Sequence, residues 1–170
     1  MPSNVEIKAR LRDRAGVQAR AVALATEPVR VIGQEDVFFR TPSGRLKLRV
    51  FDEGSGELIY YERPDLAGPK LSDYRIAPTL EPRKLQETLR MALGLRGIVK
   101  KERTLVLVGQ TRVHLDRVEE LGDFMELEVV LTPGQSTADG QRIAEALMAK
   151  LEIQSSDLIE GAYLDLLEAR

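Results

Sequence analysis

Three carboxylates fall on one face of two neighbouring predicted strands within residues 111–131. Each strand alternates apolar and polar residues with a period of two, and residues 120–122 are expected to form the turn between them. On this pattern Asp116, Glu126 and Glu128 point to the same side of the sheet. Because carboxylates brought together repel one another unless a cation lies among them, the pattern predicts a divalent-metal site on the sheet surface.

Charged side chains recur on the polar faces of the other predicted strands. They are Glu6, Lys8, Lys47, Arg49, Arg75, Lys101 and Arg103. One interpretation is a solvated outer face with cross-strand ion pairs. The other is a barrel whose charged face lies inside and whose apolar face packs outward against amphipathic helices. We favour the barrel because outer faces usually include Thr, Ser and Gln, and because a bound polyanion with a metal would match a charged interior.

Strands joined by tight turns must position these residues. Strands are predicted at 5–11, 29–40, 45–52, 57–63, 72–77, 98–108 and, as the pair described above, within 111–131. Helices are predicted at 14–26, 82–93 and 137–151, with a last helix starting at Ser156 and Asp157. The tight turns predict antiparallel pairing, and about eight strands can close into a narrow barrel. The expected fold class is α+β, an eight-stranded antiparallel β-barrel (a tunnel) with a charged interior and flanking helices.

Length and composition narrow the function classes. A chain of 170 residues is expected to form a single domain over residues 1–170, and its net charge of −2 gives no support for binding nucleic acid or an anionic membrane. The absence of cysteine and the single histidine leave oxygen atoms as the expected metal ligands. No long apolar run and no signal-peptide core are present, so a cytoplasmic protein is expected. An exposed outer sheet surface would allow a homodimer.

Several short motifs, taken in order, resemble the CYTH superfamily, the triphosphate tunnel metalloenzymes. They are Asn4-Val-Glu6-Ile-Lys8, Lys47-Leu-Arg49, Lys101-Glu-Arg103, His114-Leu-Asp116, Glu126-Leu-Glu128 and the C-terminal Tyr163-Leu-Asp-Leu-Leu167. Each motif alone is weak, because such spacings occur by chance in many chains. The ordered set covers essentially the whole sequence, and it resembles class IV adenylyl cyclases, thiamine triphosphatases and inorganic triphosphatases.

The resemblance implies a β-tunnel that binds a small-molecule triphosphate with Mg²⁺ or Mn²⁺. The implied metal ligands are Glu6, Asp116, Glu126 and Glu128. The implied phosphate ligands are Lys8, Lys47, Arg49, Arg63, Arg75, Lys101 and Arg103. Strand register decides whether Arg63 or Glu62 points inward. One departure from the family is Asn4, which stands where the family has a glutamate and offers an uncharged ligand oxygen.

The resemblance favours a class IV adenylyl cyclase, which converts ATP to cyclic AMP and pyrophosphate. A triphosphatase that hydrolyses an inorganic, thiamine or nucleoside triphosphate is the alternative, and a non-catalytic polyphosphate-binding module is a third. Both reactions need positioned cations and metals rather than a protein nucleophile. Lys8 could assist proton removal from attacking water if its pKa were lowered. His114 is interpreted either as a phosphate or metal contact or as a structural residue, and the tyrosines 60, 61 and 74 as packing residues.

Overall fold

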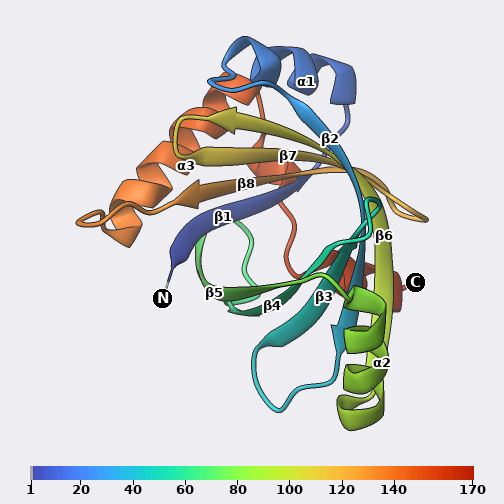
Figure 1. The fold of residues 1–170 in the computed structure, drawn as a ribbon. Coiled ribbons are helices and arrows are strands. Elements are labelled where there is room, and N and C mark those ends of the chain that lie inside the picture. The colour runs from blue at the N-terminus through green and yellow to red at the C-terminus, as the bar shows by residue number, and fades with distance from the viewer. Residues whose placement is uncertain (1) are drawn as a thin grey trace.

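A closed antiparallel barrel organises the computed structural model, which describes residues 2–170 (Figure 1). Within these residues there are eight strands: β1 (Ser3–Arg10), β2 (Arg30–Phe39), β3 (Arg45–Phe51), β4 (Gly56–Glu62), β5 (Lys70–Thr79), β6 (Leu95–Val108), β7 (Thr111–Val118) and β8 (Gly122–Val130). Their order around the barrel is β1-β5-β4-β3-β2-β6-β7-β8. The predicted fold class is therefore confirmed.

The helices begin and end where local sequence signals place them. Helix α1 (Arg14–Ala23) is capped by Asp13, whose carboxylate accepts a hydrogen bond from the Gly16 amide. Helix α2 (Pro82–Leu93) starts with proline and ends at Gly94, where φ is 82°. Helix α3 (Thr137–Leu151) carries a capping box, in which Ser136 and Asp139 bond to each other's backbone amides.

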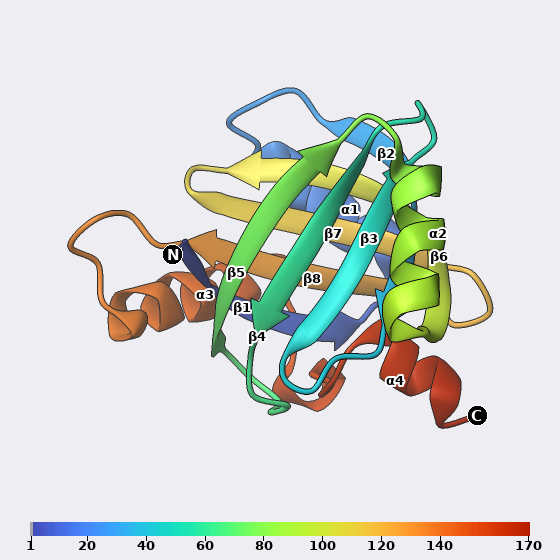
Figure 2. The same ribbon diagram turned by 60° about the horizontal axis from the view of Figure 1, so that its bottom comes forward.

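The hydrophobic core lies outside the barrel, between its wall and the helices. Figure 2 shows β3, β4 and β5 crossing in front of β1, β7 and β8, with α2 running along β3. The main cluster joins Val113, Leu115 and Leu127 of the barrel wall to Val17 of α1 and Leu151 of α3. Because these apolar side chains point outward, the alternate residues of the same strands must point inward.

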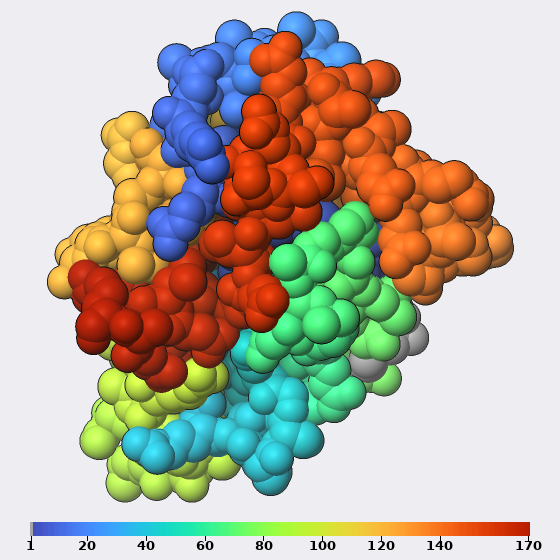
Figure 3. Space-filling model, turned by 180° about the vertical axis from the view of Figure 1, so that it is seen from behind, coloured from blue at the N-terminus to red at the C-terminus, as the bar shows by residue number. Residues whose placement is uncertain are grey.

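The C-terminal region differs from the predicted single helix. It forms a 3₁₀ turn (Ser155–Asp157), an extended stretch and a short helix α4 (Tyr163–Glu168). The extended stretch pairs with β1, since Leu158 bridges Ala9 and the Ile159 amide donates to the Lys8 carbonyl. Seen from behind, this segment (orange to red) lies beside the loop after β4 (green) (Figure 3). Backbone pairing with β1 therefore replaces the first turns of the predicted helix.

No helix within residues 2–170 is both long and apolar enough to cross a membrane.

Candidate functional site

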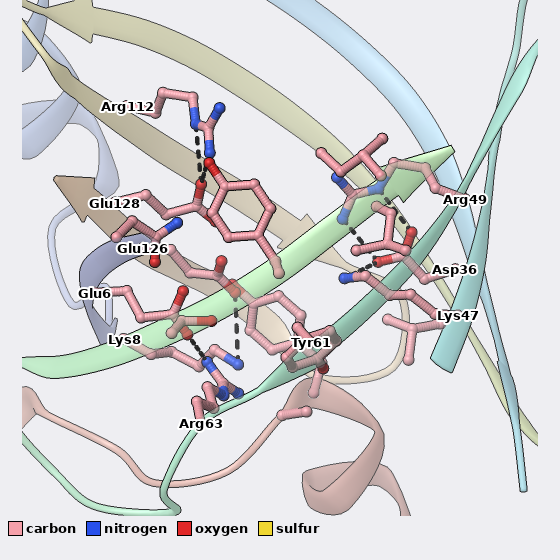
Figure 4. Close-up of a pocket in the computed structure, with 18 of the residues that line it drawn as sticks. Glu6, Lys8, Asp36, Lys47, Arg49, Tyr61, Arg63, Arg112, Glu126 and Glu128 are labelled. Atoms are coloured by element: carbon pink, nitrogen blue, oxygen red, sulfur yellow. Dashed lines mark hydrogen bonds and ion pairs between the residues drawn. The ribbon is translucent and has the colours of Figure 1, made fainter. Parts of the chain in front are cut away.

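A charged cavity of about 100 Å³ occupies the barrel interior (Figure 4). Of the described residues that line it, six are cationic: Lys8, Lys47, Arg49, Arg63, Lys101 and Arg112. Four are acidic: Glu6, Asp36, Glu126 and Glu128. The lining therefore carries an excess of positive charge that is largely removed from water, whereas the whole chain has a net charge of −2. Such an interior favours a bound anion.

Asp36 gathers cations from two neighbouring strands on one side of the cavity. Its carboxylate accepts hydrogen bonds from Lys47 Nζ at 3.1 Å and from Arg49 at 2.8 and 3.0 Å. Lys101 Nζ lies 3.4 Å from the same carboxylate. We call Asp36, Lys47, Arg49 and Lys101 the Asp36 cluster. Antiparallel pairing produces this cluster. Arg49 of β3 lies directly opposite Asp36 of β2, and Lys101 of β6 lies opposite Gln34, which is two residues before Asp36 on the same face of β2.

Three potential metal ligands converge on the opposite wall. One ligand atom from each of His114, Glu126 and Glu128 lies within 4.8 Å of the other two. Register explains this, because His114 faces Glu126 directly across β7 and β8, and Glu128 is the next inward residue. Buried within the described chain, His114 Nδ1 and Asn4 Oδ1 both lack a hydrogen-bond partner. Carboxylates beside unpaired lone pairs are what a hard or borderline cation would satisfy, so these residues fit a divalent metal.

Glu6 lies inside the cavity but is held by a cation. It faces Glu128 across β1 and β8, and its carboxylate accepts a hydrogen bond from Arg63. Burial, the largest cause, raises the pKa of Glu6, and Arg63 opposes that rise. The Gly161 carbonyl accepts hydrogen bonds from Lys8 Nζ at 3.0 Å and from Arg63 at 2.9 Å. The C-terminal segment thus contributes a carbonyl oxygen at this end of the cavity.

Asp116, expected from sequence as a metal ligand, lies outside the group formed by His114, Glu126 and Glu128. Both of its oxygens accept hydrogen bonds from Arg103 at 2.7 Å, and the Tyr163 hydroxyl donates to it at 2.9 Å. Burial would raise the pKa of Asp116, but the charges of Arg103 and Lys101 lower it to about 2. Arg103 donates both of these hydrogen bonds to Asp116 and does not line the cavity. The two residues therefore support the wall, with Arg103 also 3.7 Å from Glu126.

Arg75, expected from sequence as a phosphate ligand, is exposed and does not line the cavity. On β5 the inward residues are Ser72, Tyr74 and Ile76, so Arg75 lies on the outer face near Leu58 and Ala77. Arg63, directly after β4, lines the cavity, whereas Glu62 does not.

Two of the tyrosines interpreted as packing residues, Tyr61 and Tyr74, line the cavity. They face each other across β4 and β5, next to the inward pair of Ile59 and Ile76. One wall of the cavity is therefore apolar and aromatic, and the rest is charged.

The two lysines beside the acidic groups have perturbed titration behaviour. Burial lowers the pKa of Lys8 to about 8, although Glu126, 3.5 Å away, partly offsets this. Burial likewise lowers the pKa of Lys47 to about 7, against the opposing effect of Asp36. A buried amine without a full counter-charge favours its neutral form. An anion bound beside Lys47 would favour the charged form of that amine.

Sequence reasoning missed four residues that complete the site: Asp36, Arg112, Tyr163 and the Gly161 carbonyl. Arg112 donates to Glu128 at 3.0 Å, and the Tyr163 ring lies under Lys8 Nζ at 4.1 Å and Lys101 Nζ at 4.8 Å. A signal existed for Asp36, since its spacing of two from Gln34 and Phe38 places all three on one face of β2. No sequence signal identifies a backbone carbonyl.

Comparison with known proteins gives a consistent result. A family model described as the CYTH domain matches residues 3–163. A protein named adenylate cyclase CyaB from Aeromonas hydrophila is 28% identical over 96% of this chain and 88% of its own length. The structure of the PH1012 protein from Pyrococcus horikoshii OT3 is similar with a TM-score of 0.84, at 25% identity over 96% of this chain and 98% of that chain. A conserved hypothetical protein from Pyrococcus furiosus has a TM-score of 0.83 at 22% identity, over 96% and 99% of the two chains.

Proposed function

The chain belongs to the CYTH domain family, and on this premise we propose that it is a metal-dependent enzyme that converts ATP to cyclic AMP and pyrophosphate inside the barrel. The observation that carries the proposal is the charge of the cavity, which has six cationic side chains and four carboxylates. A triphosphate would neutralise the cationic excess, and a divalent metal would neutralise the grouped carboxylates. A protein interior tolerates such charges only when they are paired.

The proposed phosphate ligands lie on five strands or strand ends around the cavity. They are Lys8, Lys47, Arg49, Arg63 and Lys101, with Arg112 as an addition. Guanidinium groups bind phosphate oxygens in a bidentate manner, whereas lysine acts as a compact charge. Residues on different strands can hold a triphosphate from several sides, which fixes the phosphorus atom for in-line attack.

Glu6, Glu126 and Glu128 are the proposed oxygen ligands of Mg²⁺ or Mn²⁺. When bound, the metal supplies charge neutralisation on the phosphate oxygens as a Lewis acid. Arg63 orients Glu6, and Arg112 orients Glu128, through the hydrogen bonds described above. Asn4 replaces one charge of the family pattern by an amide, so the acidic group carries less negative charge here.

Lys8 is the proposed proton acceptor. Its lowered pKa of about 8 leaves roughly a tenth of the amine neutral at pH 7, and a general base acts in this neutral form. The amine is buried and is held by Glu126 and the Gly161 carbonyl. It would take the proton from the attacking oxygen, which is the ribose 3′-oxygen in a cyclase and water in a triphosphatase.

The apolar wall of the cavity supports an organic triphosphate over inorganic tripolyphosphate. Ile59, Tyr61, Tyr74 and Ile76 form one continuous patch through two cross-strand pairs. Such a surface can pack against a nucleoside but gains nothing from a phosphate chain. A triphosphatase remains the second candidate, because Lys8 can serve as a base for water equally well.

One assay separates the candidates. Purified protein is incubated with ATP and Mn²⁺ and, separately, with tripolyphosphate and Mn²⁺, and the products are measured. Cyclic AMP with pyrophosphate supports the cyclase, and orthophosphate supports the triphosphatase. Binding without turnover of either would leave the polyphosphate-binding module.

A variant pair tests the proposed metal ligands in the same assay. The double variant Glu126→Gln and Glu128→Gln is expected to lose metal-dependent turnover while remaining folded. Glu145→Gln, on the exposed face of α3, is the matched control and should keep full activity. Unfolding of the double variant would instead identify these carboxylates as structural.

A further inference from the structure

His114 presents a feature that the acidic residues alone do not explain. Its side chain is only 6% exposed, and its Nδ1 atom lacks a hydrogen-bond partner among the described residues. Nδ1 lies 3.8 Å from Glu126 Oε2 and 3.8 Å from Glu128 Oε1. Both distances exceed the limit for a hydrogen bond, so a protonated Nδ1 is not donating to either oxygen. An unprotonated Nδ1 would point a lone pair at two carboxylates, which is repulsive unless a cation lies between them.

The separations are close to those of adjacent ligands on one metal ion but wider, so binding would draw the three side chains slightly together. Ligand atoms bound about 2.1 Å from one metal lie roughly 3.0 Å apart in adjacent octahedral positions and roughly 4.2 Å apart in opposite ones. The observed 3.8 Å falls between these values. The remaining oxygen of Glu128 accepts from Arg112, and Glu126 Oε1 faces Lys8 Nζ. Arg103 lies 3.7 Å from Glu126 Oε2, too far to donate a hydrogen bond, so each glutamate keeps one oxygen without a hydrogen bond at this position.

We propose that His114 Nδ1 is a direct ligand of the metal in this site, and that the mixed nitrogen and oxygen donor set makes the site prefer Mn²⁺ to Mg²⁺. This inference rests on the proposed function only in placing the metal at the same carboxylates. Magnesium binds oxygen ligands and retains water, whereas Mn²⁺ shares these oxygen ligands and, as a transition-metal ion, accepts an imidazole nitrogen more readily. The preference therefore comes from one nitrogen atom of this chain.

The experiment uses the fact that the chain contains a single histidine. Untagged, metal-free protein is loaded with Mn²⁺ and studied by electron spin echo envelope modulation, without nucleotide. Modulation with the hyperfine pattern of a coordinated imidazole nitrogen is expected, and it can come only from His114. Absence of that nitrogen signal from bound Mn²⁺ would overturn the proposal, whatever the behaviour of variants.

Metal competition provides the second measurement. In wild-type protein, Mg²⁺ should displace Mn²⁺ only at about a hundredfold excess, as followed by the signal of free Mn²⁺. His114→Asn offers an oxygen instead of the nitrogen, and it should weaken Mn²⁺ binding about tenfold while leaving Mg²⁺ binding within about twofold. His114→Gln serves as a second variant, and circular dichroism checks the fold of both. Equal losses for the two metals would contradict the proposal.

The two proposals fail separately. A chain that shows nitrogen modulation but turns over neither ATP nor tripolyphosphate keeps the His114 inference and loses the proposed function. A chain that turns over ATP with Mg²⁺ and shows no nitrogen modulation keeps the proposed function and loses the His114 inference.

Discussion

At the scale of single residues, Asp36 shows how the site balances charge without a ligand. Its buried carboxylate contacts three cations, and their charges outweigh the effect of burial to hold the pKa of Asp36 well below its usual range. Asp36 thus occupies the place of an anion among Lys47, Arg49 and Lys101. It orients these side chains before any phosphate arrives, which reduces the ordering required on binding.

Replacing Asp36 by Asn should therefore destabilise the free protein. Removing one partner of a buried ion pair costs about 3–5 kcal/mol, because uncompensated charge remains. We expect a loss of this size in the free energy of unfolding measured with urea, and partial recovery on adding tripolyphosphate. Asp52→Asn, at an exposed position, is the control and should change stability by less than about 0.5 kcal/mol. A loss that tripolyphosphate does not relieve would argue against phosphate binding at the Asp36 cluster.

Lys47 should couple anion binding to proton uptake. Its pKa is about 7 in the folded protein against 10.5 ordinarily, so between these values the unfolded chain binds more protons. The contribution of Lys47 to the free energy of unfolding therefore rises with pH in this window. A bound polyanion raises the pKa of Lys47, so the affinity for the polyanion should fall as pH rises above about 7.

Calorimetry can measure this uptake. Tripolyphosphate is titrated at pH 8 in two buffers of different ionisation enthalpy, and wild-type protein is compared with Lys47→Arg. The arginine stays charged, so the variant should take up fewer protons, and the ligand's own titration cancels in the comparison. Equal uptake by the two proteins would contradict the assignment.

At the scale of secondary structure elements, each strand divides its residues between two environments. On β8, Glu126 and Glu128 face the cavity, whereas Leu127 lies between them in sequence and is fully buried in the outer core with α1 and α3. The helices stabilise the barrel from outside, and the charged residues contribute function rather than most of the stability.

Leu127→Ala should separate these two roles. Truncation of a fully buried leucine costs about 2–5 kcal/mol, and no cavity-lining atom is removed. We expect the urea midpoint to fall, while the affinity of the folded protein for Mn²⁺ changes by less than about twofold. Leu80→Ala, at a position 90% exposed, should leave the midpoint nearly unchanged. Loss of metal affinity together with stability would mean that the two faces are not independent.

At the scale of the whole molecule, the distribution of charged residues says more about ligand binding than the net charge of the chain does. The net charge of the chain is −2, yet the described residues that line the cavity carry an excess of cations. Closure of the barrel and the C-terminal segment bring these charges together and remove them from water. Free protein therefore contains repulsion that a bound polyanion would relieve.

Tripolyphosphate with Mn²⁺ should accordingly raise the melting temperature. At a ligand concentration about a hundred times Kd, the native state gains about 2.7 kcal/mol, which corresponds to roughly 5–10 °C for a chain of this size. Differential scanning fluorimetry measures the shift, with sulfate at equal ionic strength as the control. An unchanged melting temperature at saturating ligand would exclude a polyanion site in the barrel.

The alternation of apolar and charged residues along single strands was enough to predict, from sequence alone, which side chains face the barrel interior. The inward position of Lys8, Lys47 and Glu126 follows from a period of two on strands whose other face is continuously apolar. The boundaries of α2 and α3 follow equally from Pro82, Gly94 and the capping box at Ser136, because these signals act over one turn of chain.

Tertiary structure decided what depends on contacts between distant strands. Arg75 lies outside because the register of β5 against β4 orients it, and the polar residues on both faces of that strand conceal the register in the sequence. Asp116 accepts hydrogen bonds from Arg103 and, because the C-terminal segment returns to β1, from Tyr163. His114 lies opposite Glu126 because β7 pairs with β8 in the closed barrel. Sequence periodicity reports which face a side chain occupies, whereas its partners depend on which strands become neighbours, and only the folded chain specifies these.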